Sequence, residues 1–257
     1  GKITCVKFKD IYVTGVEITN AKNENEYGKG LYNEFEIECA IGHDITNNGD
    51  WFHKIGIGAL KKDYDAYDFS KSYHIEPAIF AVKKNSNKII IDCKSKMING
   101  YSYVLKKEIE LLDNNSFSIK YLLTNTGDKT IKTDEYTHNF LTINNDLLGS
   151  NYILKFPFQI KPELFEKTFN PEKKVEISSS KITFNSTPEG QFFFSNLSGG
   201  EEVDASWELI NTKSNIGISE IASFKTTKVN HWGWSHVVSP ELFFDISVEP
   251  GKSVEWT

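Results

Sequence analysis

Hydrophobic and polar residues alternate along much of the chain, so that every second side chain is apolar. Between residues 32 and 40, for example, Phe35, Ile37 and Cys39 alternate with three glutamates. This period of two is typical of an antiparallel strand with one buried face and one solvent-facing face. The pattern predicts a protein built largely from β-strands.

Turn residues divide the alternating runs at regular intervals. Clusters such as Asn85-Ser86-Asn87 and Asp113-Asn114-Asn115 favour hairpin turns, and they fall between apolar runs. One short segment, residues 162–167, is predicted to be helical. The predicted strands cover residues 2–20 (as one or two strands), 32–40, 78–83, 88–94, 101–112, 117–124, 152–160, 174–184, 191–195, 205–211, 216–225, 228–238, 243–248 and 254–257.

The composition supports a large β-protein. The 257 residues include 18 Phe, 11 Tyr and 5 Trp but a single Met, and aromatic residues favour pleated, half-buried sheets. Neither a linker nor a repeat period interrupts the chain. We therefore expect one domain spanning residues 1–257, folded as an all-β antiparallel sandwich or a large closed β-structure.

Charge and cysteine content narrow the function classes. The net charge of −6 argues against a nucleic-acid partner, and no apolar run approaches the roughly 20 residues of a membrane span. All 29 basic residues are lysines, so the chain has no guanidinium group to grip a phosphate or carboxylate with two hydrogen bonds. Cys5, Cys39 and Cys93 lack metal-ligand spacing and form no even disulfide set, which favours a reducing, cytoplasmic location.

The segment 132–145 contains the main candidate for chemistry. His138 stands between a polar stretch that carries carboxylates and the apolar run 140–143. The near-neutral pKa of histidine suits it to proton transfer at physiological pH, although a lone histidine is more often structural. Trp232 and Trp234 lie two residues apart on one predicted strand face, where they either fill the core or stack on a sugar.

Short motifs in order along the chain resemble those of one known family. They are the run Trp51–Leu60, the pair Tyr73-His74, the turn Asn125-Thr126-Gly127 followed by Tyr136–Phe140, and Ser239-Pro240-Glu241 ahead of the Pro250-Gly251 turn. Together they cover most of the chain, and they resemble the galactose mutarotase-like (aldose 1-epimerase) superfamily. The resemblance implies an antiparallel β-supersandwich that binds a free sugar without a metal or an organic cofactor.

The resemblance also implies a mechanism. In that superfamily a glutamate removes the proton of the anomeric hydroxyl and a histidine protonates the ring oxygen, so that the sugar ring opens, rotates and recloses. Glutamate and histidine suit these two transfers when burial and neighbours bring their pKa values together. The implied roles are Glu241 as general base, His138 as general acid, His74 as a helper that binds or polarises the sugar, and Lys54, His53, Trp234 and His236 as substrate-binding residues.

The chain also departs from the family pattern. Lys54 stands where an arginine is expected, no glycine pair follows His74, and the interval from Glu241 to the Pro250-Gly251 turn is short. Glu241 has a second interpretation as a turn or capping carboxylate at Pro240, and His74 as a loop histidine bonded to backbone. We expect an aldose mutarotase-like isomerase. The alternatives are a non-catalytic sugar-binding or sugar-sensing domain of the same fold and one domain of a glycan-processing enzyme.

Overall fold

The computed structural model describes residues 2–17, 28–38, 40–63, 65–113 and 115–257. These residues group into two compact units: unit 1 contains residues 34–135 and 244–257, and unit 2 contains residues 2–33 and 136–243. No helix in this part of the chain is long and apolar enough to cross a membrane. Within the described ranges, the one helical turn is the 3₁₀ element η1 (Pro162–Leu164) of unit 2.

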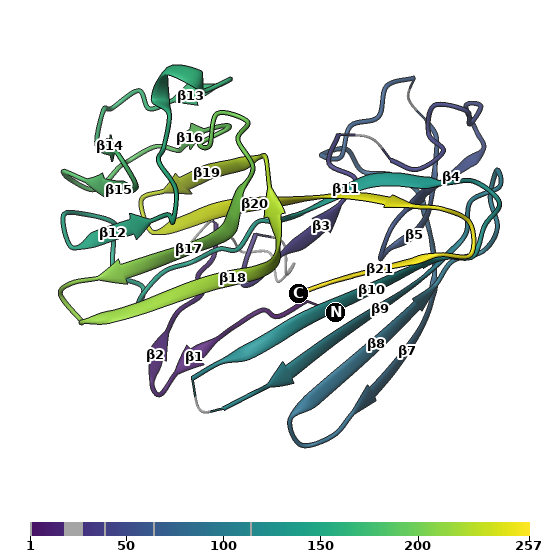
Figure 1. The fold of residues 1–257 in the computed structure, drawn as a ribbon, viewed down its shortest axis with the longest axis horizontal. Coiled ribbons are helices and arrows are strands. Elements are labelled where there is room, and N and C mark those ends of the chain that lie inside the picture. Colours follow the sequence, from purple (N-terminus) through teal and green to yellow (C-terminus); the bar gives the residue numbers. More distant parts are fainter. Residues whose placement is uncertain (1, 18–27, 39, 64, 114) are drawn as a thin grey trace. The chain divides into compact units, whose positions relative to one another are not determined.

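Unit 1 contains two antiparallel sheets (Figure 1). Tyr121 and Leu123 are buried while their neighbours Lys120 and Leu122 are more exposed, so the alternation in the sequence is the alternation of burial. The five-stranded sheet has the order β21 (Ser253–Trp256), β10 (Phe117–Asn125), β9 (Tyr103–Leu111), β8 (Lys88–Lys94) and β7 (Ile79–Lys84), and the three-stranded sheet has the order β4 (Trp51–Lys54), β5 (Gly58–Lys61) and β6 (Ile75–Pro77).

Unit 2 has its core between two larger sheets. The rings of Phe184 and Phe192 lie 5.8 Å apart across this core, and Leu154, Ile182 and Leu209 are fully buried in it. Besides the ribbon β1 (Lys7–Phe8) and β2 (Ile11–Tyr12), unit 2 holds a five-stranded sheet in the order β14 (Val175–Ser178), β15 (Lys181–Phe184), β12 (Tyr152–Lys155), β17 (Val203–Asn211) and β18 (Ile216–Thr226).

The second larger sheet is six-stranded and positions the candidate site. Three of its strands, β20, β11 and β3, contain residues of both units, and the site lies on the residues that belong to unit 2. The strand order is β13 (Thr168–Phe169), β16 (Phe192–Phe194), β19 (Val229–Trp234), β20 (Val237–Val248), β11 (Ile131–Thr137) and β3 (Asn33–Phe35).

Most of the predicted strands are confirmed. The runs 78–83, 88–94, 101–112 and 117–124 are β7 to β10, and 205–211 with 216–225 form the β17–β18 hairpin. The predicted strand 2–20 is β1 and β2, and its residues 18–20 lie outside the described residues, as does Cys39. The fold class, all-β and antiparallel, is therefore confirmed.

Several predictions are wrong in detail. The predicted strand 152–160 ends at Lys155, and 243–248 is the end of β20 and no separate strand. The strand 228–238 is two strands, because β19 ends at Trp234 and β20 begins at Val237, which leaves His236 in the turn. The predicted strand 174–184 is likewise two strands, the hairpin β14–β15. The predicted helix 162–167 is reduced to the single 3₁₀ turn η1. The strand from residue 32 ends at Phe35 because Glu36 adopts a left-handed backbone with φ 62°.

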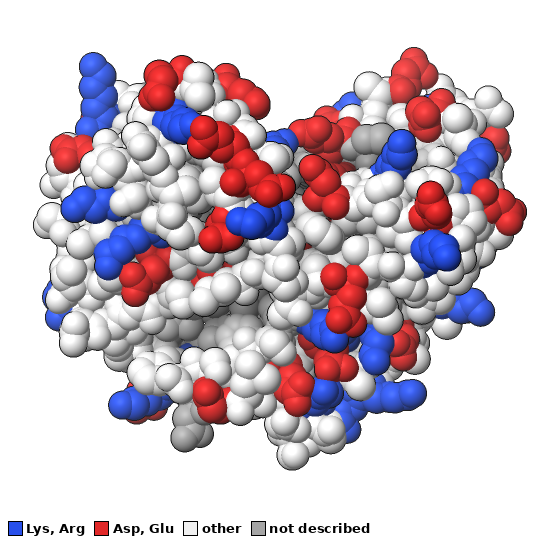
Figure 2. All heavy atoms as spheres, in the orientation of Figure 1, with Lys and Arg blue, Asp and Glu red and all other residues white. Residues whose placement is uncertain are grey.

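Charged side chains of both signs are interspersed on the face shown in Figure 2. Among the described residues, several lysines form exposed ion pairs, for example Lys120 with Glu255 at 2.8 Å and Lys155 with Glu208 at 3.2 Å. Such exposed pairs contribute little stability, on the order of 0–1 kcal/mol each. The stability of the fold therefore depends on its apolar cores. The prediction from the net charge that the protein has no nucleic-acid partner stays a prediction.

The close packing of β19 against β16 gives a test of this core. A Cβ atom on Gly233 would lie 2.3 Å from the Cζ atom of Phe192, whose side chain is buried. Gly233→Ala is therefore expected to lower the free energy of unfolding by about 1–3 kcal/mol in urea denaturation. The control is Gly190→Ala, whose Cβ would have its nearest neighbour, a carboxylate oxygen of Glu172, at 3.3 Å. Equal losses in the two variants would contradict the prediction.

Candidate functional site

The candidate site is built on the β19–β20 hairpin of unit 2. Glu241 lies inside β20 directly opposite Asn230 of β19, so both side chains project from the same face of the sheet. The alternative role of Glu241 as a turn or capping carboxylate is wrong, because Pro240 is itself a strand residue paired with His231. The register of this hairpin places a carboxyl group on the sheet face.

His138 reaches Glu241 from the end of β11. It is the first residue after that strand, and its backbone N–H donates to the Tyr32 carbonyl at 2.7 Å. The Nε2 atom of His138 lies 3.5 Å from Oε1 of Glu241, and the two side chains are 19% and 6% exposed. The structure thus brings together the histidine and the glutamate to which the sequence analysis gave the two proton transfers.

Two asparagines orient the Glu241 carboxyl group. The backbone N–H of Asn196 donates to Oδ1 of Asn230 at 3.0 Å, so the Asn230 amide nitrogen faces the other way and donates to Oε2 of Glu241 at 3.2 Å. Asn196 directs its N–H in this way from a left-handed backbone with φ 56°, which asparagine tolerates. Oε1 of Glu241 is left to face His138.

Aromatic rings surround the His138 imidazole. The ring centroids of Phe140, Trp232 and Tyr136 lie 4.8, 5.2 and 6.1 Å from that of His138. Among the described residues, Nδ1 of His138 and the indole N–H of Trp232 have no hydrogen-bond partner. Trp232 is partly exposed. The site therefore combines a dehydrated acid–base pair with an aromatic surface and an N–H group that a ligand can reach.

Burial shifts the pKa values of the pair in opposite directions. It raises the pKa of Glu241 to about 8, against the opposing effect of the Asn230 hydrogen bond, and it lowers the pKa of His138 to about 4. Both shifts favour the neutral form of the group. Between these values the coupled pair holds one proton, mainly on the Glu241 carboxyl group. To act as a base, Glu241 must first pass this proton to His138.

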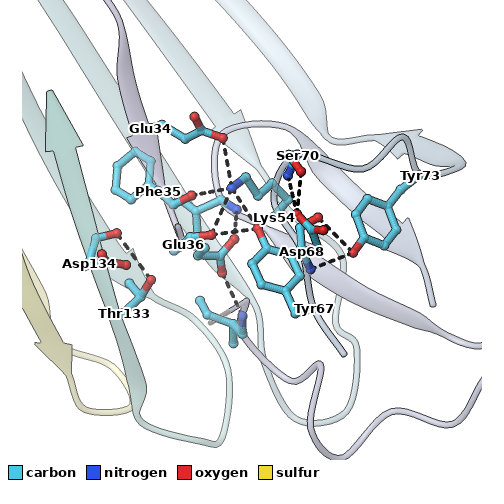
Figure 3. Close-up of polar contacts among 12 residues, drawn as sticks. Glu34, Phe35, Glu36, Lys54, Tyr67, Asp68, Ser70, Tyr73, Thr133 and Asp134 are labelled. Atoms are coloured by element: carbon cyan, nitrogen blue, oxygen red, sulfur yellow. Dashed lines mark hydrogen bonds and ion pairs between the residues drawn. The ribbon is translucent and has the colours of Figure 1, made fainter. Parts of the chain in front are cut away.

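Lys54 occupies the centre of a hydrogen-bonded cluster in unit 1 (Figure 3). Its ammonium group donates to the carbonyl oxygens of Phe35 at 2.5 Å and Glu36 at 3.1 Å and to the Tyr67 hydroxyl at 3.0 Å, and it pairs with Glu34 at 3.2 Å. Lys54 is 4% exposed. The ammonium has three N–H donors, and protein groups take up all three.

His53 and His74, also in unit 1, differ in exposure. His53 is buried with Nε2 at 3.0 Å from the Tyr101 carbonyl, and burial lowers its pKa. His74 is exposed, and its ring centroid lies 5.7 Å from that of Trp51. Because the His138–Glu241 pair belongs to unit 2, the sugar-binding and helper roles of His53, Lys54 and His74 stay predictions.

Trp234 and His236, the remaining predicted binding residues, have backbone partners in unit 2. The indole N–H of Trp234 donates to the Glu189 carbonyl at 2.9 Å, and Nε2 of His236 lies 2.8 Å from the Val16 carbonyl. Their rings are 6.2 Å apart. Trp232 is the tryptophan of this strand that contacts His138. The binding roles of Trp234 and His236 stay predictions.

The sequence analysis missed Asn230 as a partner of Glu241, and it named Trp234, not Trp232, as the substrate-binding tryptophan, whereas Trp232 is the one that contacts His138. The pairing of β19 with β20 places Asn230 beside Glu241, and no local sequence motif marks this contact. The contact of Trp232 with His138 depends on how the end of β11 packs against β19. Among the described residues, no group of three or more His, Cys, Asp and Glu side chains is arranged to hold a metal ion.

Comparison with proteins of solved structure identifies the fold. No protein-family model and no curated protein sequence matches the chain. A galactose mutarotase-like protein from Clostridium acetobutylicum has 11% identity and a TM-score of 0.57 over 99% of this chain and 87% of its own. A candidate aldose 1-epimerase from Klebsiella pneumoniae has 12% identity and a TM-score of 0.59 over 99% and 72%, and one from Escherichia coli K12 has 8% and 0.56 over 89% and 82%.

At these identities the likeness shows the fold, and the fold is the galactose mutarotase-like β-supersandwich that the sequence motifs imply. Solved structures with this fold therefore include candidate aldose 1-epimerases. The residues that would carry such an activity in this chain are argued from its own geometry.

The buried Glu241 carboxyl group should make stability depend on pH. Its pKa is raised from 4.5 to about 8 in the folded protein, so its stabilising contribution is complete below pH 4.5 and is lost as the pH rises through about 8. Glu241→Gln keeps the shape of the neutral acid and removes the titration. We expect the variant to match the wild type near pH 5 and to be more stable by roughly a few kcal/mol at pH 9. Urea denaturation across this range tests it, and parallel pH profiles would contradict it.

Proposed function

We propose that this protein is an aldose 1-epimerase-type isomerase, which interconverts the anomers of a free aldose by opening and reclosing the sugar ring. The observation that carries the proposal is the His138–Glu241 pair, with Nε2 and Oε1 3.5 Å apart on a sheet face of a galactose mutarotase-like fold. A dehydrated carboxyl–imidazole pair that holds one proton can both donate and accept a proton, as ring opening requires.

The proposed reaction moves two protons and breaks one bond. Glu241 takes the proton of the anomeric hydroxyl while His138 gives a proton to the ring oxygen, and the bond from the anomeric carbon to the ring oxygen breaks. The open-chain aldehyde rotates about the adjacent carbon–carbon bond. Ring closure then returns the proton from Glu241 to the anomeric oxygen and the ring-oxygen proton to His138. The pair ends with the single proton with which it began.

The orientation of Glu241 supports its role as the base and that of His138 as the acid. Asn230 occupies Oε2 of the carboxyl group, so Oε1 is the oxygen that can exchange a proton with the sugar or with His138. Trp232 and Phe140 lie beside the imidazole. Phe140 is buried, whereas Trp232 is partly exposed. The apolar face of Trp232 suits the C–H surface of a sugar, and its indole N–H suits a sugar hydroxyl.

A second candidate function is sugar binding without catalysis. The cluster around Lys54 favours it, because this lysine stands in place of the family's arginine and its ammonium group is engaged by protein groups in unit 1. A sensor would bind the sugar yet leave the rate of anomer interconversion unchanged. Calorimetry and polarimetry on the same sample separate the two functions.

Polarimetry on freshly dissolved α-glucose and α-galactose tests the isomerase. We expect the protein to accelerate mutarotation, and His138→Gln and Glu241→Gln each to lower kcat by about 100-fold or more, the scale of a general acid or base. The control is His231→Gln, a buried histidine on the opposite face of β19. No acceleration of any common aldose, or full activity in His138→Gln, would overturn the proposal.

The rate should follow a bell-shaped pH profile. Below a pH of about 4 both groups of the pair are protonated and no base is present, and above about 8 both have lost their proton and no acid is present. We expect kcat/KM to be highest between these limbs. A profile that rises steadily up to pH 10 would contradict a pair that shares one proton.

Trp232 should contribute to sugar binding more than Trp234 does. Trp232→Ala removes the ring that packs beside His138 and is expected to raise KM about tenfold, the effect of losing a stacking contact worth about 1.4 kcal/mol. Trp234→Ala removes a ring whose N–H already bonds to Glu189 and is expected to change KM less. The comparison of KM in the two variants is the test, and the reverse order would contradict it.

A further inference from the structure

One edge of the five-stranded sheet of unit 1 is uncovered. β7 is the last strand in the order, it lies at the outer edge of the sheet in Figure 1, and all of its residues are exposed. Ile79, Phe80 and Val82 are 73%, 44% and 63% exposed. An apolar strand at a sheet edge is a ready template for pairing with another strand.

The backbone of β7 alternates between its partner strand and the outer edge. At the hairpin between β7 and β8, the Asn85 N–H donates to the Lys88 carbonyl. Counting back along β7 from Asn85, every second residue therefore forms its backbone hydrogen bonds with β8. The N–H and carbonyl groups of Phe80, Val82 and Lys84 therefore point outward. The described residues give these groups no hydrogen bond.

The matching edge in unit 2 differs. β18 ends the other five-stranded sheet, and its exposed residues are glycine, serine and lysine, apart from Ile221 at 79% exposure. Partly buried residues alternate with these exposed ones along the strand. β18 thus has one polar face toward solvent, whereas β7 exposes apolar side chains on both faces.

We propose that β7 pairs antiparallel with β7 of a second copy of this chain, about a two-fold axis that passes beside Val82. In this register Val82 faces Val82 of the partner subunit, and Phe80 faces Lys84 of the partner subunit. The lysine ammonium can then lie over the phenylalanine ring. The two five-stranded sheets would form one continuous sheet, an arrangement in which each edge protects the other.

The charges and hydrogen bonds of the strand favour this register. A shift that centres the axis on Ala81 would pair Lys84 with Ala78, whose N–H already donates to the Ile57 carbonyl. The opposite shift would set Lys83 against Lys83 of the partner subunit, and like charges directly opposite each other are unfavourable. The register about Val82 avoids both and places each lysine opposite an apolar residue. Because the strand is complementary to itself in this way, a second copy is the occupant we propose.

Light scattering coupled to size-exclusion chromatography tests the proposal on the full chain. We expect a species of about twice the 29.3 kDa chain mass that dissociates on dilution. Val82→Lys would set two ammonium groups against each other at the axis and is expected to weaken dimerisation at least tenfold. The control is Ile221→Lys, which makes the same exchange on the edge strand β18 and should leave the dimer intact.

A cross-link tests the register itself. Opposed residues of an antiparallel pair have Cα atoms about 5.5 Å apart, within the range of a disulfide. In a Cys5→Ser background, since Cys5 is exposed, Val82→Cys should form a covalent dimer under mild oxidation. Ile79→Cys, about 20 Å from its own copy in this register, should not.

The outcomes are decisive and do not depend on the proposed enzyme activity. A monomeric wild type at high micromolar concentration, a dimer unchanged by Val82→Lys, or equal cross-linking through residues 79 and 82 would each overturn the proposal. Retention of the wild-type circular dichroism spectrum by Val82→Lys shows that a loss of dimer is not a loss of fold.

Discussion

The removal of Glu241 and His138 from water is the physical constraint on which the site depends. A carboxylate or an imidazolium in a dehydrated place costs several kcal/mol unless it is paired or neutralised. The two groups solve this problem together, because at 3.5 Å they can hold one proton between them and remain neutral. The neighbouring aromatic rings keep water away from the imidazole, and the hydrogen bond from Asn230 keeps the carboxyl group in place.

The cluster in unit 1 solves the same problem in a different way. Glu36 is fully buried, and its carboxyl oxygens accept the backbone N–H groups of Ile41 at 2.9 Å and Ile55 at 2.8 Å. Burial nevertheless raises the pKa of Glu36 to about 7, partly offset by the charge of Lys54. Here backbone donors hold both oxygens, so the carboxyl group braces loops of unit 1. In unit 2 one oxygen faces a histidine, and chemistry becomes possible.

The strands could be predicted because their alternation records which side chains face the core. The breaks were harder. Ser235 is the single turn-favouring residue between Trp234 and Val237, so the turn at His236 gave only a weak local signal. The left-handed backbone of Glu36 ended a strand whose alternation continues. The meeting of His138 with Glu241 was expected from a resemblance to known proteins. The contact of Asn230 with Glu241 follows from the register between β19 and β20, which is a property of the folded sheet.

The buried lysines of unit 1 have a practical consequence in a chain whose 29 basic residues are all lysine. Lys54 and Lys62 are 4% and 8% exposed, and the ammonium of Lys62 donates to the carbonyl groups of His43 and Thr46. Acylating reagents need a free, accessible amine, so these two sites are shielded while surface lysines react. Peptide mapping after brief acetylation would therefore reveal local opening of unit 1 through the chain's own lysine amines, without an engineered probe.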